Sequence, residues 1–144
     1  MKISIEEIPA DEPPEIIIRC HTIDEGIHKI INRIKTLEDM VIGYQGNQIH
    51  RVVPKDVYYF EAVDSKVFIY TKSEVYESKQ KLYEFEELNN GFYLRTSKSV
   101  IMNLKKIKYV SPAFNGRFEA CFDNGEKLII SRQYVSELKK RLQI

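Results

Sequence analysis

The apolar residues of this chain follow two different periods, and the change falls near residue 41. Before that point, isoleucines recur at the spacing of one helix face, and Thr22 or Asp24 is placed to cap a helix that runs to about Leu37. The isoleucines of this face are Ile23, Ile27, Ile30, Ile31 and Ile34. Because an apolar face of this kind has to be covered, we expect it to pack on the rest of the chain or on a second copy.

Two strand-like runs precede this helix. Lys2–Ile5 and Ile16–Cys20 are rich in isoleucine, and the prolines between them favour an extended or loop segment. These patterns predict a small strand–helix unit over residues 1–40, which we interpret as a dimerisation element.

From about Val41 onward, apolar and polar residues alternate as they do in half-buried strands. This pattern predicts strands at Val41–Tyr44, Gln48–Val53, Val57–Val63, Val67–Thr71, Glu74–Ser78, Tyr93–Thr96, Ser99–Leu104, Tyr109–Ser111, Arg117–Phe122 and Lys127–Ile130. Asn124-Gly125 is the strongest hairpin signal, because both residues accept the positive φ of a tight turn.

Two short helices interrupt the strands. Lys81–Leu88 has apolar residues at every third position, and Asn89-Asn90-Gly91 is placed to end it. Ser131 is placed to cap a final helix over Gln133–Leu142. The predicted fold is therefore mainly β, of the α+β class, with antiparallel sheets and short helices over residues 41–144.

Length and composition place the chain among ordinary globular proteins. Its 144 residues suit one domain with a small appendage, and 43% hydrophobic and 30% charged residues can form a buried core. Cys20 and Cys121 have neither a disulfide pattern nor metal-site spacing. The N-terminus lacks the apolar stretch of a secretory signal, and the aliphatic run Ile16–Ile18 is too short to cross a membrane, so we expect a cytoplasmic protein.

The net charge of +1 conceals a strong asymmetry between the two parts of the chain. Residues 1–94 hold 11 Lys and Arg against 17 Asp and Glu, whereas residues 95–144 hold 11 against 4. A basic C-terminal third indicates an anionic partner, although Lys139, Lys140 and Arg141 also suit the solvated face of the last helix.

Catalytic patterns are missing from the sequence. It contains no Gly-rich phosphate loop, no paired metal-ligand motif and no Gly-x-Ser-x-Gly turn. Cys20 and His21 are adjacent, so on a strand their side chains point to opposite faces. We therefore expect a protein that is not an enzyme and has no cofactor, metal or small-molecule substrate.

Aromatic residues in two of the predicted strands allow two interpretations. Tyr58, Tyr59, Phe60, Phe68 and Tyr70 could stack on the bases of a single strand. Their alternation with polar residues instead favours the core of a sheet.

The cations have a more specific distribution. Residues 95–99 read Arg-Thr-Ser-Lys-Ser, a cluster of two cations and three hydroxyls that suits phosphate oxygens. Three more cations lie singly in other loops: Lys66 after a predicted turn, Arg117 beside Asn115-Gly116, and Arg132 at the start of the last helix. A cation at a helix N-terminus opposes the macrodipole, so a role outside helix stability is indicated for Arg132.

Taken together, these elements resemble the LytTR-type DNA-binding domain, the β-rich module of many bacterial response regulators. The resemblance covers roughly residues 42–142. It rests on stretches that occur in the family's order: Val57–Val63 as its aromatic-Glu strand, Leu82–Leu88 as its Leu-rich helix, Phe92–Leu104 as its Arg-containing strand pair, and Asn124-Gly125 followed by Ile130–Tyr134 as its ending.

The resemblance implies a domain that binds duplex DNA without a recognition helix, through sheet-edge loops that enter successive grooves. By position it implies DNA contacts from Lys66, Lys98, Ser99 and Arg132, with Arg95, Ser97, Asn103, Asn115 and Arg117 as further candidates. A guanidinium can bond guanine O6 and N7 in a bidentate manner, so Arg132 is the expected base reader. Lys98 and Ser99 are expected to contact phosphate or a groove edge.

Two departures from the family pattern limit what the resemblance implies. The commoner His-Arg-Ser triplet is Ser97-Lys98-Ser99 here, so no base preference is transferred. Residues 1–40 are too few for a receiver domain, so the chain resembles stand-alone members. Regulation is then expected through abundance, dimerisation or a membrane-protein partner rather than phosphorylation.

The expected function is that of a sequence-specific transcriptional regulator that binds double-stranded promoter DNA as a homodimer. The alternative is a protein-interaction or anti-activator module that kept the fold and lost the DNA surface. The basic loops discriminate between the two, because the alternative requires no role for Lys98 or Arg132 in duplex binding.

Overall fold

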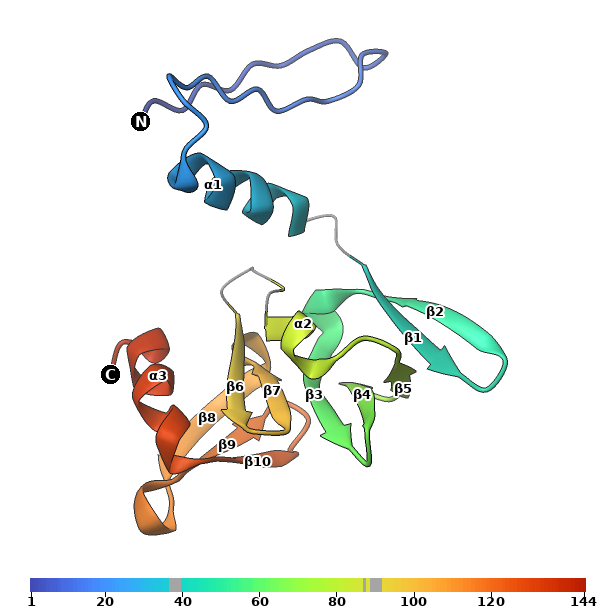
Figure 1. Ribbon diagram of the computed structural model, residues 1–144, viewed down its shortest axis with the longest axis vertical. Helices are drawn as coiled ribbons and strands as arrows, with labels where there is room; N and C mark the ends of the chain where they lie inside the picture. Colours follow the sequence, from blue (N-terminus) through green and yellow to red (C-terminus); the bar gives the residue numbers. More distant parts are fainter. Residues whose placement is uncertain (37–39, 87, 89–91) are drawn as a thin grey trace.

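Two antiparallel sheets and three short helices form the fold of the computed structural model, which describes residues 1–36, 40–86, 88 and 92–144 (Figure 1). The helices are α1 Glu25–Thr36, α2 Leu82–Glu86 and α3 Arg132–Leu142. The strands are β1 Val41–Gln45, β2 Gln48–Val52, β3 Val57–Val63, β4 Lys66–Thr71, β5 Val75–Ser78, β6 Tyr93–Ser97, β7 Val100–Asn103, β8 Ile107–Pro112, β9 Phe118–Phe122 and β10 Lys127–Ile130. Single 3₁₀ turns, η1 to η3, occupy Pro54–Asp56, Leu104–Lys106 and Phe114–Gly116.

The larger sheet has seven strands in the order β2-β1-β5-β4-β3-β7-β6, and the smaller has three in the order β10-β9-β8. Each strand pairing in the described residues is antiparallel. The mainly β, α+β class predicted from the sequence is confirmed, and the strands lie within two residues of their predicted ends. The stop signal at residues 89–91 and the expected helix end at residue 37 lie outside the described residues.

Strand β3 contributes to both hydrophobic clusters of the protein. Its Phe60 packs with α2, where the ring stacks on Phe85 with centroids 4.1 Å apart. A bulge between Val57 and Tyr59 interrupts the pairing with β4, and Tyr58 and Tyr59 both belong to the second cluster, which includes residues of β9 and α3. The core interpretation is confirmed for Tyr58, Tyr59 and Phe60, which are buried, and Tyr70 packs partly buried against the second cluster. Phe68 is half-buried on β4 and belongs to neither cluster, and the bulge replaces the strict alternation that the sequence suggested.

The turn of the β9–β10 hairpin differs from what its sequence suggests. The β9–β10 hairpin forms as predicted, but only Gly125 of the Asn124-Gly125 pair has a positive φ, at +88°. The Gly125 N–H donates to the Phe122 carbonyl at 3.0 Å, and the Asn124 side chain accepts the Glu126 N–H at 2.9 Å. This side-chain bond favours a wider turn with glycine in the left-handed position.

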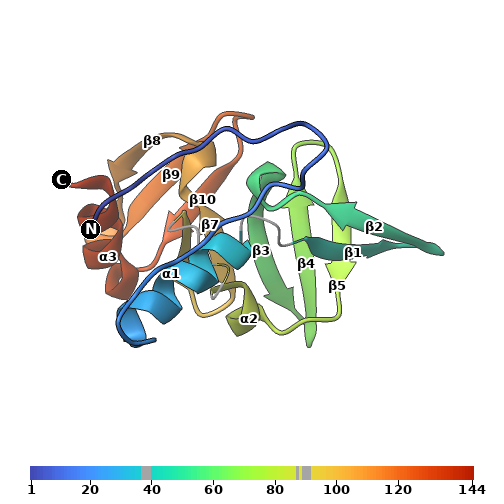
Figure 2. The same ribbon diagram turned by 90° about the horizontal axis from the view of Figure 1, so that it is seen from above.

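The N-terminal segment contains the predicted helix but not the predicted strands. Asp24 is the cap, because its Oδ1 accepts the Ile27 N–H at 2.9 Å. Lys2–Ile5 and Ile16–Cys20, both in the described residues, form no strand, and Ile3 and Ile17 are 83% and 68% exposed. A strand requires a hydrogen-bonded partner, and this segment loops above α1 away from the sheets (Figures 1 and 2).

Candidate nucleic-acid interface

The turn between β6 and β7 holds Lys98 outward in solvent. Ser97 ends β6 and pairs with Val100 at the start of β7, which leaves Lys98 and Ser99 as the turn. The Ser97 Oγ accepts the Ser99 N–H at 3.2 Å and lies 3.3 Å from the Ser99 Oγ. These local bonds fix the turn, so the exposed Lys98 is held on an ordered support.

Arg95 supports this turn from behind. Its Nε donates to Glu86 Oε1 at 2.6 Å and its Nη1 donates to the Lys98 carbonyl at 2.7 Å. The side chain is 18% exposed in this ion pair with α2. Arg95 therefore stabilises the β6–β7 hairpin through these bonds and is less exposed than Lys98.

The start of α3 is joined to the same hairpin. The Ser131 N–H donates to the Thr96 carbonyl on β6 at 2.8 Å. Ser131 occupies the predicted N-cap position, yet its side chain makes no cap hydrogen bond in the described structure, which leaves the hydroxyl on the surface beside Arg132. The positive end of the helix dipole adds to the Arg132 charge and strengthens the local attraction for anions.

The loop between β8 and β9 approaches Arg132 from the other side. Asn115 and Gly116 both adopt left-handed conformations, with φ of +60° and +73°, and the Ala113 N–H donates to the Arg117 carbonyl at 2.8 Å. A Cβ atom at Gly116 would lie 3.1 Å from Arg132 Cδ, so the loop packs closely on the arginine stem. Arg117 follows this turn and is exposed.

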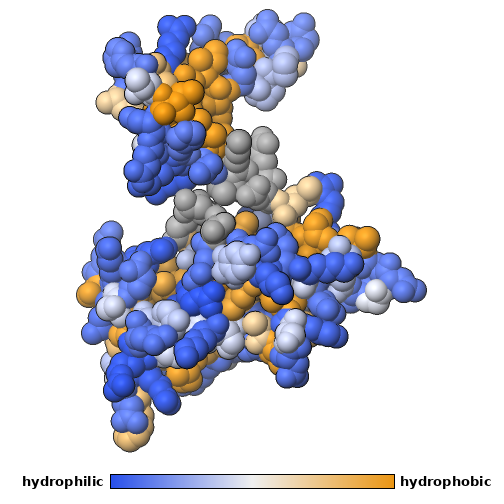
Figure 3. Space-filling view, viewed as in Figure 1, coloured by the Kyte–Doolittle hydropathy of each residue, from blue (hydrophilic) through white to orange (hydrophobic). Residues whose placement is uncertain are grey.

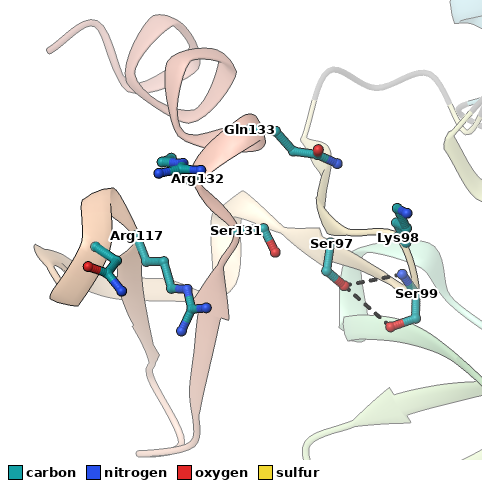
Figure 4. A pocket seen from close by; sticks show the side chains of 8 residues that line it. Ser97, Lys98, Ser99, Arg117, Ser131, Arg132 and Gln133 are labelled. Atoms are coloured by element: carbon teal, nitrogen blue, oxygen red, sulfur yellow. Dashed lines mark hydrogen bonds between the residues drawn. The ribbon is translucent and has the colours of Figure 1, made fainter.

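These three segments enclose a hollow of about 690 Å³. Its lining residues are Ser97, Lys98, Ser99, Asn115, Arg117, Ser131, Arg132 and Gln133 (Figure 4). Among the described residues, none of its three cations forms an ion pair, and no carboxylate is among the lining residues. A concave surface with uncompensated positive charge and several hydroxyls attracts polyanions and can hydrogen-bond their oxygens.

The structure therefore brings six of the nine predicted site residues together. Ser97, Lys98, Ser99, Asn115, Arg117 and Arg132 line the hollow. Lys66 lies apart, exposed at the start of β4 after Asp64 and Ser65, whose φ values are +51° and +65°. The turn between β3 and β4 nevertheless lies on the same lower side of the molecule as the turn between β6 and β7 (Figure 1).

Asn103 belongs to the interior, and its prediction as a DNA contact is wrong for this fold. The residue is 2% exposed, its Nδ2 donates to the Val57 carbonyl at 2.8 Å, and its Oδ1 accepts the Lys105 N–H at 3.0 Å. Both ends of the amide are bonded within the protein, so the side chain links β7 to the start of β3.

Two lining residues, Ser131 and Gln133, were missed as site candidates. Ser131 was interpreted as a helix cap, and Gln133 as an ordinary residue of the first turn. Their positions on either side of Arg132 are the signal that could have identified them.

The described residues contain neither a candidate metal-binding group nor a candidate membrane-spanning helix. No group of three or more His, Cys, Asp or Glu side chains among them could hold a metal ion. None of the helices formed by these residues is long and apolar enough to cross a bilayer.

Residues 47–143 match the family model described as the LytTr DNA-binding domain. In solved structures, the chain is similar to the LytTr DNA-binding domain of a Bacillus cereus protein described as a methyl-accepting/DNA response regulator. The TM-score is 0.70 at 29% identity, over 74% of this chain and 99% of that one.

Two curated relatives differ in how much of their length is matched. The sensory transduction protein LytT of Enterococcus faecalis is 31% identical over 97 residues, which are 67% of this chain and 40% of that protein. An uncharacterized HTH-type transcriptional regulator of Staphylococcus aureus strain NCTC 8325 is 28% identical over 140 residues, or 95% of each chain. The similarity to the second protein therefore includes most of the N-terminal segment.

Proposed function

This chain belongs to the LytTR DNA-binding domain family, and from that premise we propose that it is a transcriptional regulator that binds duplex promoter DNA through its cationic hollow. One observation carries the proposal: Lys98, Arg117 and Arg132 come from three separate segments and line one hollow. Nothing in the folding of the described residues compensates these charges, so they are available to an external anion. A regulator of this kind has to reach chromosomal DNA, so we propose that it acts in the bacterial cytoplasm.

We assign different tasks to the side chains of the hollow. Lys98 and Arg117 contact phosphates, and the Ser131 hydroxyl and one hydroxyl of the Ser97–Ser99 pair donate to phosphate oxygens, which fixes the position of the duplex. Arg132 reads a guanine through its O6 and N7 atoms. Lys66, at the start of β4 next to the β3–β4 turn, contacts the duplex at an adjacent groove.

The N-terminal segment is proposed to pair two copies. The isoleucines of α1, Ile27, Ile30, Ile31 and Ile34, are only partly covered, and Ile16, Ile17 and Ile23 are each more than 65% exposed. Figure 3 shows hydrophobic side chains gathered on this part of the molecule. A second copy would cover them, and two linked domains would bind repeated sites with greater avidity than one. Regulation through this pairing, through abundance or through a membrane-protein partner stays a prediction.

A footprint on promoter fragments tests the proposed function. The full-length protein should protect a defined site, and a K98A/R132A double variant should lose that protection. K140A, which removes an exposed cation near the other end of α3, is the matched control and should protect the site normally. Protection that survives in the double variant would contradict the assigned site. A wild-type protein that binds no duplex would favour the protein-interaction alternative.

A further inference from the structure

Phe114 is the most exposed large hydrophobic residue in the described part of the chain after residue 40. Its relative exposure is 82%, compared with 59% for Tyr83 and 47% for Tyr109. A single exposed apolar side chain is common on protein surfaces and carries no meaning alone. The position of Phe114 provides a second observation, because it opens η3 and is followed by Asn115 and, two residues further on, Arg117, which both line the cationic hollow.

The loop that carries Phe114 is ordered by its own backbone. Arg117 closes it at both ends: its carbonyl accepts the Ala113 N–H at 2.8 Å and its N–H donates to the Phe114 carbonyl at 3.4 Å. Asn115 and Gly116 reverse the chain in left-handed conformations, and Gly116 rests against the Arg132 stem. The phenyl ring is therefore held outward by a fixed support, and ordering it on a ligand costs little entropy.

The chain around Phe114 is suited to a polyanion. Residues 95–118 contain six Lys and Arg and no Asp or Glu. The loop projects from the same lower side of the molecule as the turn between β6 and β7 (Figure 1). An exposed ring on the loop that also carries Arg117 matches a nucleic acid, which combines phosphates with apolar base faces. A purely apolar protein surface would leave Arg117 desolvated without a partner.

We propose that Phe114 is an apolar wedge that enters a base step of the bound duplex, next to the phosphates held by Arg117. This inference rests on the proposed function and deepens it. Proteins that insert a phenyl group between base pairs unstack the step and bend the duplex. Pyrimidine–purine steps unstack most readily, so the wedge would favour a TA or CA step at a position that no hydrogen bond reads.

The test uses the full-length protein and a duplex that contains its footprint. 2-Aminopurine, placed singly at successive positions, reports unstacking through its fluorescence, and donor and acceptor dyes at the two ends report bending. Wild type should raise the fluorescence at one step near the Arg117 contact and shorten the end-to-end distance. F114A should bind about 5- to 100-fold more weakly and lose both signals. F114L keeps an apolar wedge and should retain most of the bend.

Controls separate this inference from the proposed function and from a folding defect. Y83A removes an exposed aromatic residue on α2 and should leave both signals unchanged.

If F114A binds with wild-type affinity and gives the same fluorescence and bend, the wedge is ruled out while duplex binding stands. If F114A binds the duplex normally but loses binding to another protein of the cell, the ring serves that partner and the wedge is again ruled out. If wild type binds no duplex, the proposed function and the wedge fail together.

Discussion

Arg95 and Arg132 show that the same type of side chain serves two different purposes in this domain. Arg95 is committed to Glu86 and the Lys98 carbonyl, whereas Arg132 is exposed beside the hollow. The resemblance made Arg132 the expected base reader and Arg95 a further candidate, but the sequence could not show that Arg95 is held by the protein itself. Their difference depends on the packing of α2, which brings Glu86 to Arg95 and which no local pattern encodes.

Substitutions of Asn103 and Asn115, the two asparagines predicted as DNA contacts, should have different effects on stability and on duplex binding. N103A removes two internal hydrogen bonds and leaves the Val57 carbonyl and the Lys105 N–H without this partner. Its free energy of unfolding should fall by about 1–3 kcal/mol, measured by urea denaturation.

N115A is the matched change at the surface. Because Asn115 lines the hollow, its substitution should weaken duplex binding. The left-handed φ of this residue costs alanine roughly 1 kcal/mol or more, so N115G provides the comparison without that strain. Equal loss of stability in N103A and N115G would contradict the assignment of Asn103 to the interior.

At the scale of elements, two tyrosines of β3 connect the larger sheet to the turn of the smaller one. The Tyr58 hydroxyl donates to Asp123, and the Tyr59 hydroxyl donates to Glu126 at 2.5 Å. The Tyr59 ring also stacks on Tyr70, with centroids 4.3 Å apart. The sequence predicted both strands and the hairpin. It could not predict this link, because the bulge that turns both tyrosines the same way arises from the register with β4.

This link should make stability depend on pH in the alkaline range. The hydrogen bond to the Asp123 carboxylate, together with burial and its charge, raises the pKa of Tyr58 to about 12. Burial and the bond to Glu126 also raise the pKa of Tyr59. A group whose pKa is higher in the folded state stabilises the fold below its unfolded pKa of about 10, and this stability is lost as the pH rises.

Urea denaturation between pH 9 and pH 12 measures the effect. The free energy of unfolding of wild type should fall from about pH 10 upward, and Y58F should fall less steeply because one titrating group is gone. Y83F, on the exposed face of α2, is the control and should follow wild type. Parallel curves for Y58F and wild type would show that Tyr58 does not link the sheets in the manner described.

A further prediction at the scale of elements concerns the isoleucine face of α1 and the proposed dimer. I27K/I31K should convert a wild-type dimer to a monomer in sedimentation velocity, because two lysines cannot be buried in an apolar contact. I49K alters an isoleucine of β2 that is 68% exposed and should leave the dimer intact. A wild-type chain that remains monomeric at high concentration, with and without DNA, would refute the proposed pairing.

At the scale of the whole molecule, three cations of the basic C-terminal third line one hollow. All three cations of the hollow come from residues 95–144, the part of the chain in which the charge asymmetry indicated an anionic partner, and that partner stays a prediction. The sequence could not show that the β8–β9 loop meets the start of α3. That meeting depends on how the smaller sheet and α3 pack in the second hydrophobic cluster. The six gathered residues were therefore predictable one by one, and the hollow itself was not.

The salt dependence of duplex binding tests the central claim most directly. If Lys66, Lys98 and Arg117 each neutralise one phosphate, the logarithm of the association constant should fall with the logarithm of salt concentration at a slope of about −3 per bound copy. K98A should reduce the steepness by about 1, and K140A should not change it. Measured on the footprinted promoter fragment, the predicted result is a steep slope that K98A makes shallower and K140A leaves unchanged. Duplex binding that is absent, or that is independent of salt, would contradict the account.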